Sequence, residues 1–140
     1  MANIAVVYWS GTGNTEQMAQ MVANGAKEAG AEATVFSTSE FNADMVEKFD
    51  AFAFGCPSMG AEELEDTEFA PLFNECLPKL KDKKLGLFGS YGWGDGEWMR
   101  TWVEACKNAG ASLVSDGVIC NDAPDDSAEA QCNALGASLV

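Results

Sequence analysis

Apolar and polar positions along the chain define short apolar runs separated by amphipathic stretches. The runs are continuous and rich in strand-forming residues, which is typical of strands covered on both faces of a parallel sheet. The last run is interrupted around Ser115–Gly117. The pattern therefore predicts five strands, within residues 3–9, 33–36, 51–55, 85–91 and 112–120.

Between these runs, apolar residues recur at spacings of three and four, which is the period of one helix face. Gly30 and Gly110 end two of these stripes and fit C-terminal caps, and Asn42 fits an N-cap. The stripes predict helices within residues 18–29, 41–49, 69–77, 99–109 and 128–139.

The alternation of strands and helices indicates an α/β fold, a doubly wound parallel sheet with helices on both faces. A length of 140 residues suits a single domain, residues 1–140. Ligands of such sheets bind beyond the carboxyl ends of the strands. The candidate segments are therefore residues 10–15, 56–66 and 91–97, which follow the first, third and fourth strands.

The net charge narrows the class of partner. A formal charge of −14, from 22 acidic and 8 basic residues, argues against nucleic acid, because phosphate contacts need clustered Lys and Arg. The same charge attracts basic partners, although general solubility explains it equally well. No apolar run approaches the roughly 18 residues of a membrane span, and the start lacks a signal-peptide pattern. We therefore expect a cytoplasmic protein.

The cysteine and histidine content limits the chemistry. The five cysteines are well separated, form no metal or dithiol motif, and are expected to be buried, reduced thiols. We expect no bound metal. The chain has no histidine, which removes imidazole base catalysis. A bound cofactor is therefore expected to perform any electron or proton chemistry.

The loop of residues 10–15 joins the first strand to a helix N-terminus. Its glycines let the backbone approach a ligand, and the free amides and positive end of the helix favour an anion. Asn14 stands where a nucleotide-binding P-loop needs lysine, and the dinucleotide fingerprint lacks its last glycine. These features favour a cradle for one phosphate monoester, and a tight turn with polar caps is the alternative.

Three segments resemble the flavin-binding loops of flavodoxins: YWSGTGNT at 8–15, CPSMGAEELED at 56–66 and GLFGSYGWGDGEW at 86–98. Their order and separation are similar to those of the short-chain subgroup, and the resemblance covers essentially the whole chain. It implies a five-stranded sheet in the order 2-1-3-4-5 and one noncovalently bound flavin mononucleotide (FMN).

The resemblance also implies a role for each site residue. Met59 would pack on the inner face of the isoalloxazine ring and Trp93 on its outer face, and Glu62 would accept a hydrogen bond from flavin N3–H. Core packing is the alternative for Met59 and Trp93, and a solvated surface position is the alternative for Glu62. The expected cofactor-binding residues are Ser10, Gly11, Thr12, Gly13, Asn14 and Thr15 in the first loop, Pro57, Ser58, Met59, Gly60, Ala61 and Glu62 in the second, and Ser90, Tyr91, Gly92, Trp93 and Gly94 in the third.

The implied function is low-potential electron transfer, in which FMN cycles between semiquinone and hydroquinone. The Gly60–Ala61 peptide would turn its carbonyl toward flavin N5 after the first electron, and acidic residues around the ring would oppose the second. We expect Ala61 to stabilise the semiquinone less than glycine does, because a positive φ costs alanine about 1–2 kcal/mol. Pro57 replaces a hydroxyl residue of other members.

The expected partners are redox proteins with basic surfaces, and the chain is expected to be a monomer without substrate turnover of its own. Three rival interpretations remain. A flavin-dependent quinone or nicotinamide oxidoreductase would need a substrate pocket over the ring. A signalling receiver domain would need an acidic residue where Gly55-Cys56-Pro57 ends the third strand. A flavodoxin-like activator of one radical enzyme fits the sequence as well.

Overall fold

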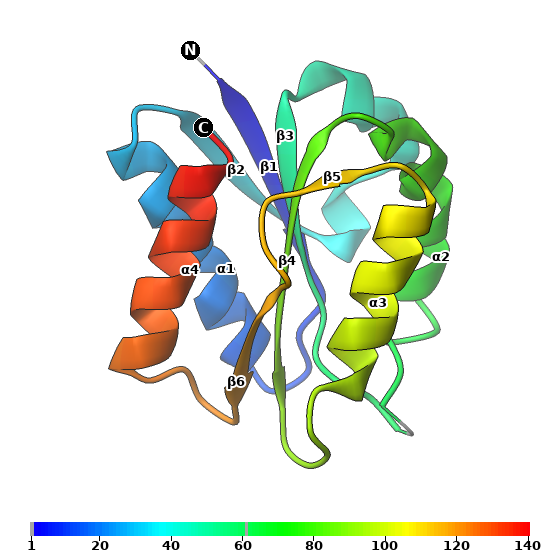
Figure 1. Ribbon diagram of the computed structural model, residues 1–140, viewed down its shortest axis with the longest axis vertical. Helices are drawn as coiled ribbons and strands as arrows, with labels where there is room; N and C mark the ends of the chain where they lie inside the picture. Colours follow the sequence, from blue (N-terminus) through cyan, green and yellow to red (C-terminus); the bar gives the residue numbers. More distant parts are fainter. Residues whose placement is uncertain (1, 61) are drawn as a thin grey trace.

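In the computed structural model, which describes residues 2–60 and 62–140, the apolar runs form a parallel sheet (Figure 1). The strand order is β2-β1-β3-β4-β5, and β6 also pairs with β4. The predicted fold class and strand order are confirmed. The strands are β1 (Asn3–Tyr8), β2 (Glu32–Ser37), β3 (Ala51–Gly55), β4 (Lys84–Tyr91), β5 (Ser112–Leu113) and β6 (Val118–Asn121).

The predicted interruption of the last strand divides one edge of the sheet into two short strands. β5 pairs with the start of β4, where Lys84 lies opposite Ser112, and β6 pairs with its end, where Tyr91 lies opposite Asn121. Gly117, between the two, has a φ of 95°, which favours glycine. At the carboxyl end of β4, the neighbouring strand on this side is therefore β6 and not β5.

Helices cover both faces of the sheet. α1 and α4 pack on one face, and α2 and α3 lie on the other (Figure 1). The α-helices are α1 (Asn14–Glu28), α2 (Phe69–Cys76), α3 (Glu97–Asn108) and α4 (Asp126–Ser138), and the 3-10 segments are η1 (Thr38–Glu40), η2 (Ala43–Lys48) and η3 (Leu77–Leu80). The short helix predicted within 41–49 is thus a 3-10 segment, and the predicted cap is present, because the Asn42 side chain accepts from the Asp44 amide at 3.0 Å.

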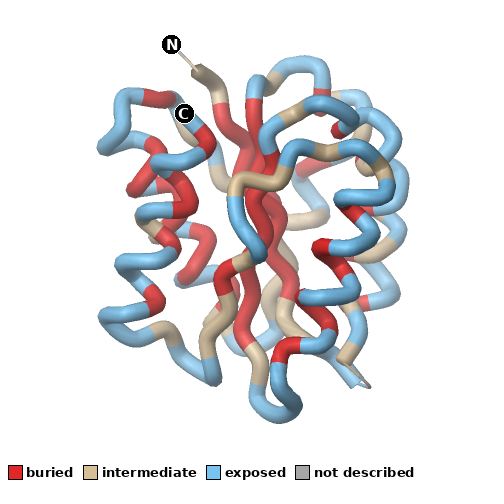
Figure 2. The backbone as a smooth tube through the Cα atoms, in the orientation of Figure 1, coloured by how far each residue is buried: buried red, intermediate tan, exposed pale blue. Residues whose placement is uncertain are grey.

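Two cores lie on either side of the sheet, because neighbouring residues of a strand point to opposite faces. In β1, Ala5 and Val7 pack toward α2 and α3, whereas Ile4 and Val6 pack toward α1 and α4. Figure 2 shows the central strands buried along most of their length. Within residues 2–60 and 62–140, every helix is too short or too polar to cross a lipid bilayer.

The cysteines are free thiols, and four of them are buried. Burial raises the pKa of the Cys56 thiol to about 12, so this group stays protonated near neutral pH. Cys120 is only partly buried, and the expectation that all five are buried is therefore wrong at this position. It lies in β6 at the edge of the sheet, where there is no further strand among the described residues to cover it.

Candidate functional site

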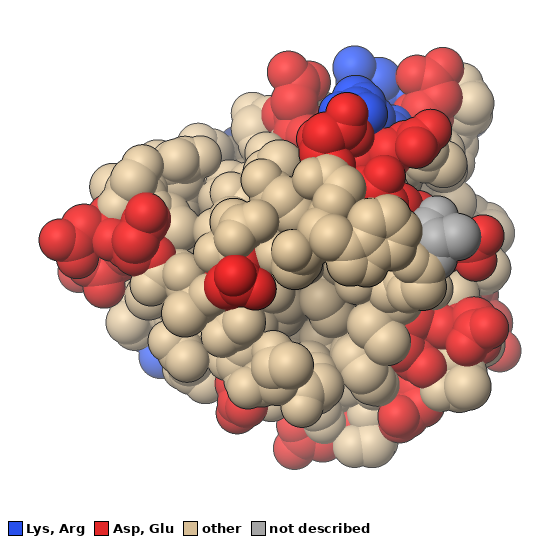
Figure 3. Space-filling model, turned by 90° about the horizontal axis from the view of Figure 1, so that it is seen from below, with Lys and Arg blue, Asp and Glu red and all other residues tan. Residues whose placement is uncertain are grey.

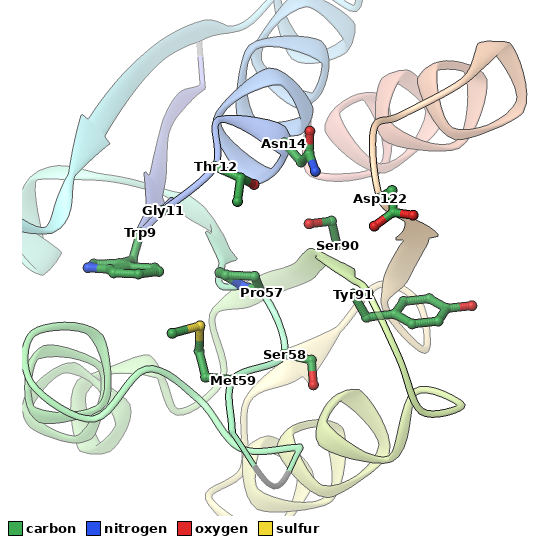
Figure 4. A pocket seen from close by; sticks show the side chains of 11 residues that line it. Trp9, Gly11, Thr12, Asn14, Pro57, Ser58, Met59, Ser90, Tyr91 and Asp122 are labelled. Atoms are coloured by element: carbon green, nitrogen blue, oxygen red, sulfur yellow. The ribbon is translucent and has the colours of Figure 1, made fainter.

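A pocket of about 240 Å³ opens at the carboxyl ends of β1, β3, β4 and β6. In Figure 4, Thr12 and Asn14 lie along one side of it, and Ser58 and Met59 lie opposite them. The residues that line the pocket are Trp9, Gly11, Thr12, Asn14, Pro57, Ser58, Met59, Ser90, Tyr91, Gly92 and Asp122. All three predicted loops therefore meet at one place, together with a fourth segment after β6.

The first loop turns sharply into α1. The Ser10 hydroxyl oxygen accepts from the Gly13 amide at 3.0 Å, and Gly13 has a φ of 95°. Gly13 is also the N-cap of α1, and no side chain among the described residues caps this helix. The first-turn amides and the positive end of the 15-residue helix are therefore left for an external acceptor beside the pocket.

Thr15 lies behind the loop and is only 1% exposed. Its hydroxyl oxygen accepts from the Ser90 amide at 3.4 Å and lies 3.5 Å from the Ser90 hydroxyl. The Thr15 side chain therefore links the start of α1 to β4, and Gly11, Thr12 and Asn14 are the members of the loop that line the pocket.

The second loop is a tight turn. The amide of Met59 donates to the carbonyl of Glu63 at 2.8 Å, and the amide of Glu63 donates to the carbonyl of Met59 at 2.9 Å. Gly60 and Glu62 have φ values of 52° and 56°. Pro57, Ser58 and Met59 line the pocket, whereas Gly60 and Glu62 lie beyond its lining. The predicted role of Ala61 falls outside the described residues.

The third loop carries the most exposed aromatic ring. Trp93 is 62% exposed and Met59 is 37% exposed, and both belong to loops at the pocket. Tyr91 and Gly92 line the pocket, while Trp93 and Gly94 stand outside its lining. Large apolar side chains left exposed in loops beside a pocket indicate a surface that a ligand or partner covers.

The rear of the second loop is fastened by Glu65, which is 5% exposed. Its carboxylate accepts from the amides of Thr67, Glu68 and Phe69 and from the Thr67 hydroxyl. Burial alone would raise the pKa of Glu65, but these hydrogen bonds outweigh it and lower the pKa to about 2. A Glu65 carboxylate that is ionised near neutral pH therefore ties the loop to the start of α2.

Two residues of the pocket lining, Trp9 and Asp122, were not among the predicted cofactor-binding residues. The Trp9 indole N–H donates to Glu68 Oε2 at 3.2 Å, and the Asp122 amide donates to the Tyr91 carbonyl at 2.8 Å. Trp9 directly follows β1 and precedes the predicted loop, and Asp122 directly follows β6. The rule that ligands bind beyond the carboxyl ends of the strands thus also covers the loop after the last strand.

Charge is distributed unevenly over this edge of the molecule. In Figure 3, acidic side chains lie mostly around the periphery of the face at the carboxyl ends of the strands, and its centre is largely neutral. Asp122 is the one carboxylate among the described residues that line the pocket, and no Lys or Arg is among them. An anionic group bound here would be held by amides and hydroxyls rather than by cations.

The arrangement fits the two ends of FMN. The neutral glycine loop and the open N-terminus of α1 fit a phosphate ester. The walls formed by Trp9, Pro57, Met59 and Tyr91 suit a flat apolar ring.

Comparisons with known proteins agree with this fit. The sequence model of the flavodoxin family matches residues 6–135. The chain is 46% identical to a flavodoxin from Megasphaera elsdenii over 133 residues, which cover 95% of both chains. It is 42% identical to a flavodoxin from Clostridium beijerinckii over 135 residues, which cover 96% of this chain and 97% of that one. The solution structure of two-electron reduced M. elsdenii flavodoxin is similar with a TM-score of 0.89 at 46% identity, over 97% of each chain.

Proposed function

The chain belongs to the flavodoxin family, and we propose which of its residues hold FMN and how they serve electron transfer. It is an FMN-binding electron-transfer protein that serves redox partner proteins. We propose that residues 1–140 act as one FMN-binding domain. The observation that supports the proposed site best is the uncapped N-terminus of α1, which meets an uncharged glycine loop at the pocket.

The phosphate of FMN would be held by residues 10–15. Thr12 and Asn14 line the pocket and would donate from their side chains, while Ser10 and Thr15 hold the loop in shape. Gly11 and Gly13 would leave the backbone amides open to the phosphate oxygens. Hydrogen bonds to a charged acceptor contribute about 1.5–3 kcal/mol each, so two or three of them provide a firm grip.

The ring would lie between the second and third loops. The proposed contacts are Pro57, Ser58, Met59, Gly60, Ala61 and Glu62 on one side and Ser90, Tyr91, Gly92, Trp93 and Gly94 on the other. Met59 and Trp93 are exposed side chains that a flat ring would cover. Burial of such apolar surface contributes about 25 cal/mol per Å².

Bound FMN supplies the redox chemistry, because its ring accepts and releases electrons one or two at a time. The protein would hold the ring at this face, whose periphery carries acidic side chains (Figure 3). Each carboxylate near the ring raises the cost of adding negative charge, by some tenths of a kcal/mol at about 10 Å. We therefore propose a low-potential carrier.

The acidic surface would also select partners. The net charge of −14 and exposed acids such as Glu63, Asp66 and Glu97 favour redox proteins that dock through basic surfaces. With 140 residues and Trp93 beside the ring, little is left for a substrate pocket, so we propose a carrier without substrate turnover of its own. We further propose that it acts as a monomer in the cytoplasm.

The test begins with the visible spectrum of the purified protein. A yellow protein with one FMN per chain is expected, and apoprotein should quench the fluorescence of added FMN at a one-to-one ratio. Anaerobic titration with dithionite then gives the two midpoint potentials, and the second should lie well below that of free FMN. A colourless protein that leaves FMN fluorescence unchanged contradicts the proposal.

A further inference from the structure

We infer that Glu62 is a positioning residue that fastens the second ring loop (residues 57–66) to the first turn of α3. Glu62 Oε1 accepts from the amide of Glu97 at 3.2 Å, across 35 residues of sequence. The contact lies within the protein itself, and the inference rests on the proposed function only where FMN binding is measured.

The N-terminus of α3 needs an acceptor from elsewhere. Its N-cap is Gly96, with a φ of 95° and no side chain that can cap the helix. The amides of Met99 and Arg100 both donate to the Gly96 carbonyl, at 3.1 Å each. The Glu97 amide donates to Glu62 instead, and a carboxylate at the positive end of a helix is stabilised by the helix dipole.

Gly94 leaves the space that this carboxylate occupies. A Cβ atom at Gly94 would lie 2.4 Å from Glu62 Oε1 and 2.5 Å from its carboxyl carbon, far inside van der Waals contact. Gly94 also has a φ of 87°, which disfavours other residues. The third loop is thus shaped around a side chain of the second loop.

The backbone of Glu62 is held in an uncommon conformation. Its φ of 56° lies in the left-handed region, which costs a residue with a side chain about 1–2 kcal/mol. The paired hydrogen bonds between Met59 and Glu63 enclose the residue in a turn that maintains this conformation. Such local strain persists where the surrounding structure fixes it. In this conformation the Glu62 carboxylate reaches the first turn of α3.

Other charged groups nearby do not share this contact. Arg100 pairs with Asp95 at 2.9 Å rather than with Glu62. Glu63, the adjacent glutamate, is exposed and makes no side-chain hydrogen bond to the described residues. Among the described residues, Glu62 therefore contacts one backbone amide, in addition to its proposed hydrogen bond to flavin N3–H. Glu63 offers a matched control on the same turn.

The hydrogen bond from the Glu97 amide to Glu62, called the latch below, would hold the second and third loops in place relative to each other before the ring is bound. Loops ordered in advance lose less conformational entropy on binding, and affinity gains by that difference. Breaking the latch should therefore weaken FMN binding and loosen the first turn of α3 together.

The first experiment measures amide hydrogen exchange of Glu97 by NMR in the full-length protein as purified. In Glu62→Ala, the Glu97 amide should exchange about tenfold faster, as expected for the loss of one hydrogen bond. Glu62→Gln keeps an acceptor oxygen and should restore most of the protection, and Glu63→Ala should match the wild type. Equal exchange in wild type and Glu62→Ala would overturn the latch.

The second experiment is a double-mutant cycle with Gly94→Ala. This change should expel the carboxylate and speed Glu97 exchange when Glu62 is present. It should have a clearly smaller effect in the Glu62→Ala background, where only the strain of alanine at a positive φ remains. Additive effects would mean that the two residues act independently, which contradicts the inference. The FMN dissociation constant should rise several-fold in Glu62→Ala, which loses both the Glu97 contact and the proposed contact with flavin N3–H, and should remain near wild type in Glu63→Ala. Failure of all variants to bind FMN would count against the proposed function, whereas the exchange result would stand.

Discussion

The two ends of the pocket are built in different ways. The proposed phosphate end is one segment of six residues, 10–15, without a charged side chain and shaped by a local hydrogen bond between Ser10 and Gly13. The proposed ring end combines two loops, 57–66 and 91–97, that are rich in acids and joined by contacts between distant segments, such as Glu62 with Glu97.

This difference matches what each end has to do. A neutral, pre-shaped cradle holds an anion without a cation and without large rearrangement. The ring end must leave part of a flat group near the surface, because electrons pass to a partner there. Exposed Trp93 and Met59, within an acidic surround, fit that second task. Five tests probe this division, in decreasing order of expected effect.

The largest expected effect comes from removal of the phosphate from the ligand. Riboflavin has the ring and ribityl chain of FMN but leaves the cradle at residues 10–15 without its anion. Loss of two charge-assisted hydrogen bonds, about 3–6 kcal/mol in total, should weaken binding by roughly 10²- to 10⁴-fold. Fluorescence titration of apoprotein with each ligand measures this ratio. Equal affinities would mean that the cradle is only a structural turn.

The next effect concerns the anchor behind the ring loop. Glu65→Ala removes an acceptor for three amides and one hydroxyl at the start of α2. We expect the free energy of unfolding to fall by about 2–4 kcal/mol, because one buried and three part-buried hydrogen bonds to a charged acceptor are lost. Urea denaturation of the apoprotein measures it. Asp66→Ala, a change of the exposed neighbour, should stay within about 0.5 kcal/mol of wild type.

The same anchor has a characteristic pH dependence. The pKa of Glu65 is lowered to about 2, so its stabilising contribution is complete above the ordinary glutamate value of about 4.3. The contribution declines as the pH falls from about 5 toward 2. The stability difference between wild type and Glu65→Gln should shrink over that interval. A difference that stays constant down to pH 2 would show that charge is not what holds the loop.

Smaller effects are expected for two threonines of the loop at residues 10–15: Thr12, which lines the pocket, and Thr15, which lies behind the loop. Thr15→Val leaves the Ser90 amide without its acceptor in a buried position, at a cost of about 1–2 kcal/mol in unfolding free energy. Thr12→Val lies in the pocket lining and should weaken FMN binding with little change in stability. Urea denaturation and FMN titration of both variants separate the two quantities. Equal losses of FMN affinity would place both hydroxyls on the phosphate.

The sequence predicted the local features of this molecule better than the long-range ones. The cradle is contiguous, so its glycines and helix start are visible in six letters. The strands and their order follow from alternation and from the flavodoxin resemblance. The Glu62–Glu97 bond and the Trp9–Glu68 bond join residues 35 and 59 positions apart, and no local pattern marks such pairs.

The fourth wall of the pocket shows the same limit. Asp122 reaches the site because β6, and not β5, pairs with the end of β4. The sequence indicated the interruption at residues 115–117 but gave no register, so the position of Asp122 beside Gly92 could not be derived. Thr15 differs: it belongs to the predicted loop, but its hydroxyl contacts Ser90 and it is not part of the pocket lining. Its contact with the phosphate stays a prediction.

The smallest effect tests whether Asp122 opposes the ligand or helps to bind it. Its carboxylate faces the pocket from the side of Tyr91 (Figure 4), and at about 8 Å in water a unit charge repels another by about 0.5 kcal/mol. Asp122→Asn keeps the shape and tolerates the φ of 56°, so FMN should bind about two- to threefold more tightly at low salt. The gain should vanish at about 1 M salt, where the Debye length is about 3 Å, and Asp116→Asn, in an exposed turn, should give none. Weaker binding of Asp122→Asn would instead identify the carboxylate as a hydrogen-bond acceptor for the ligand. An acidic side chain would then take part in FMN binding itself.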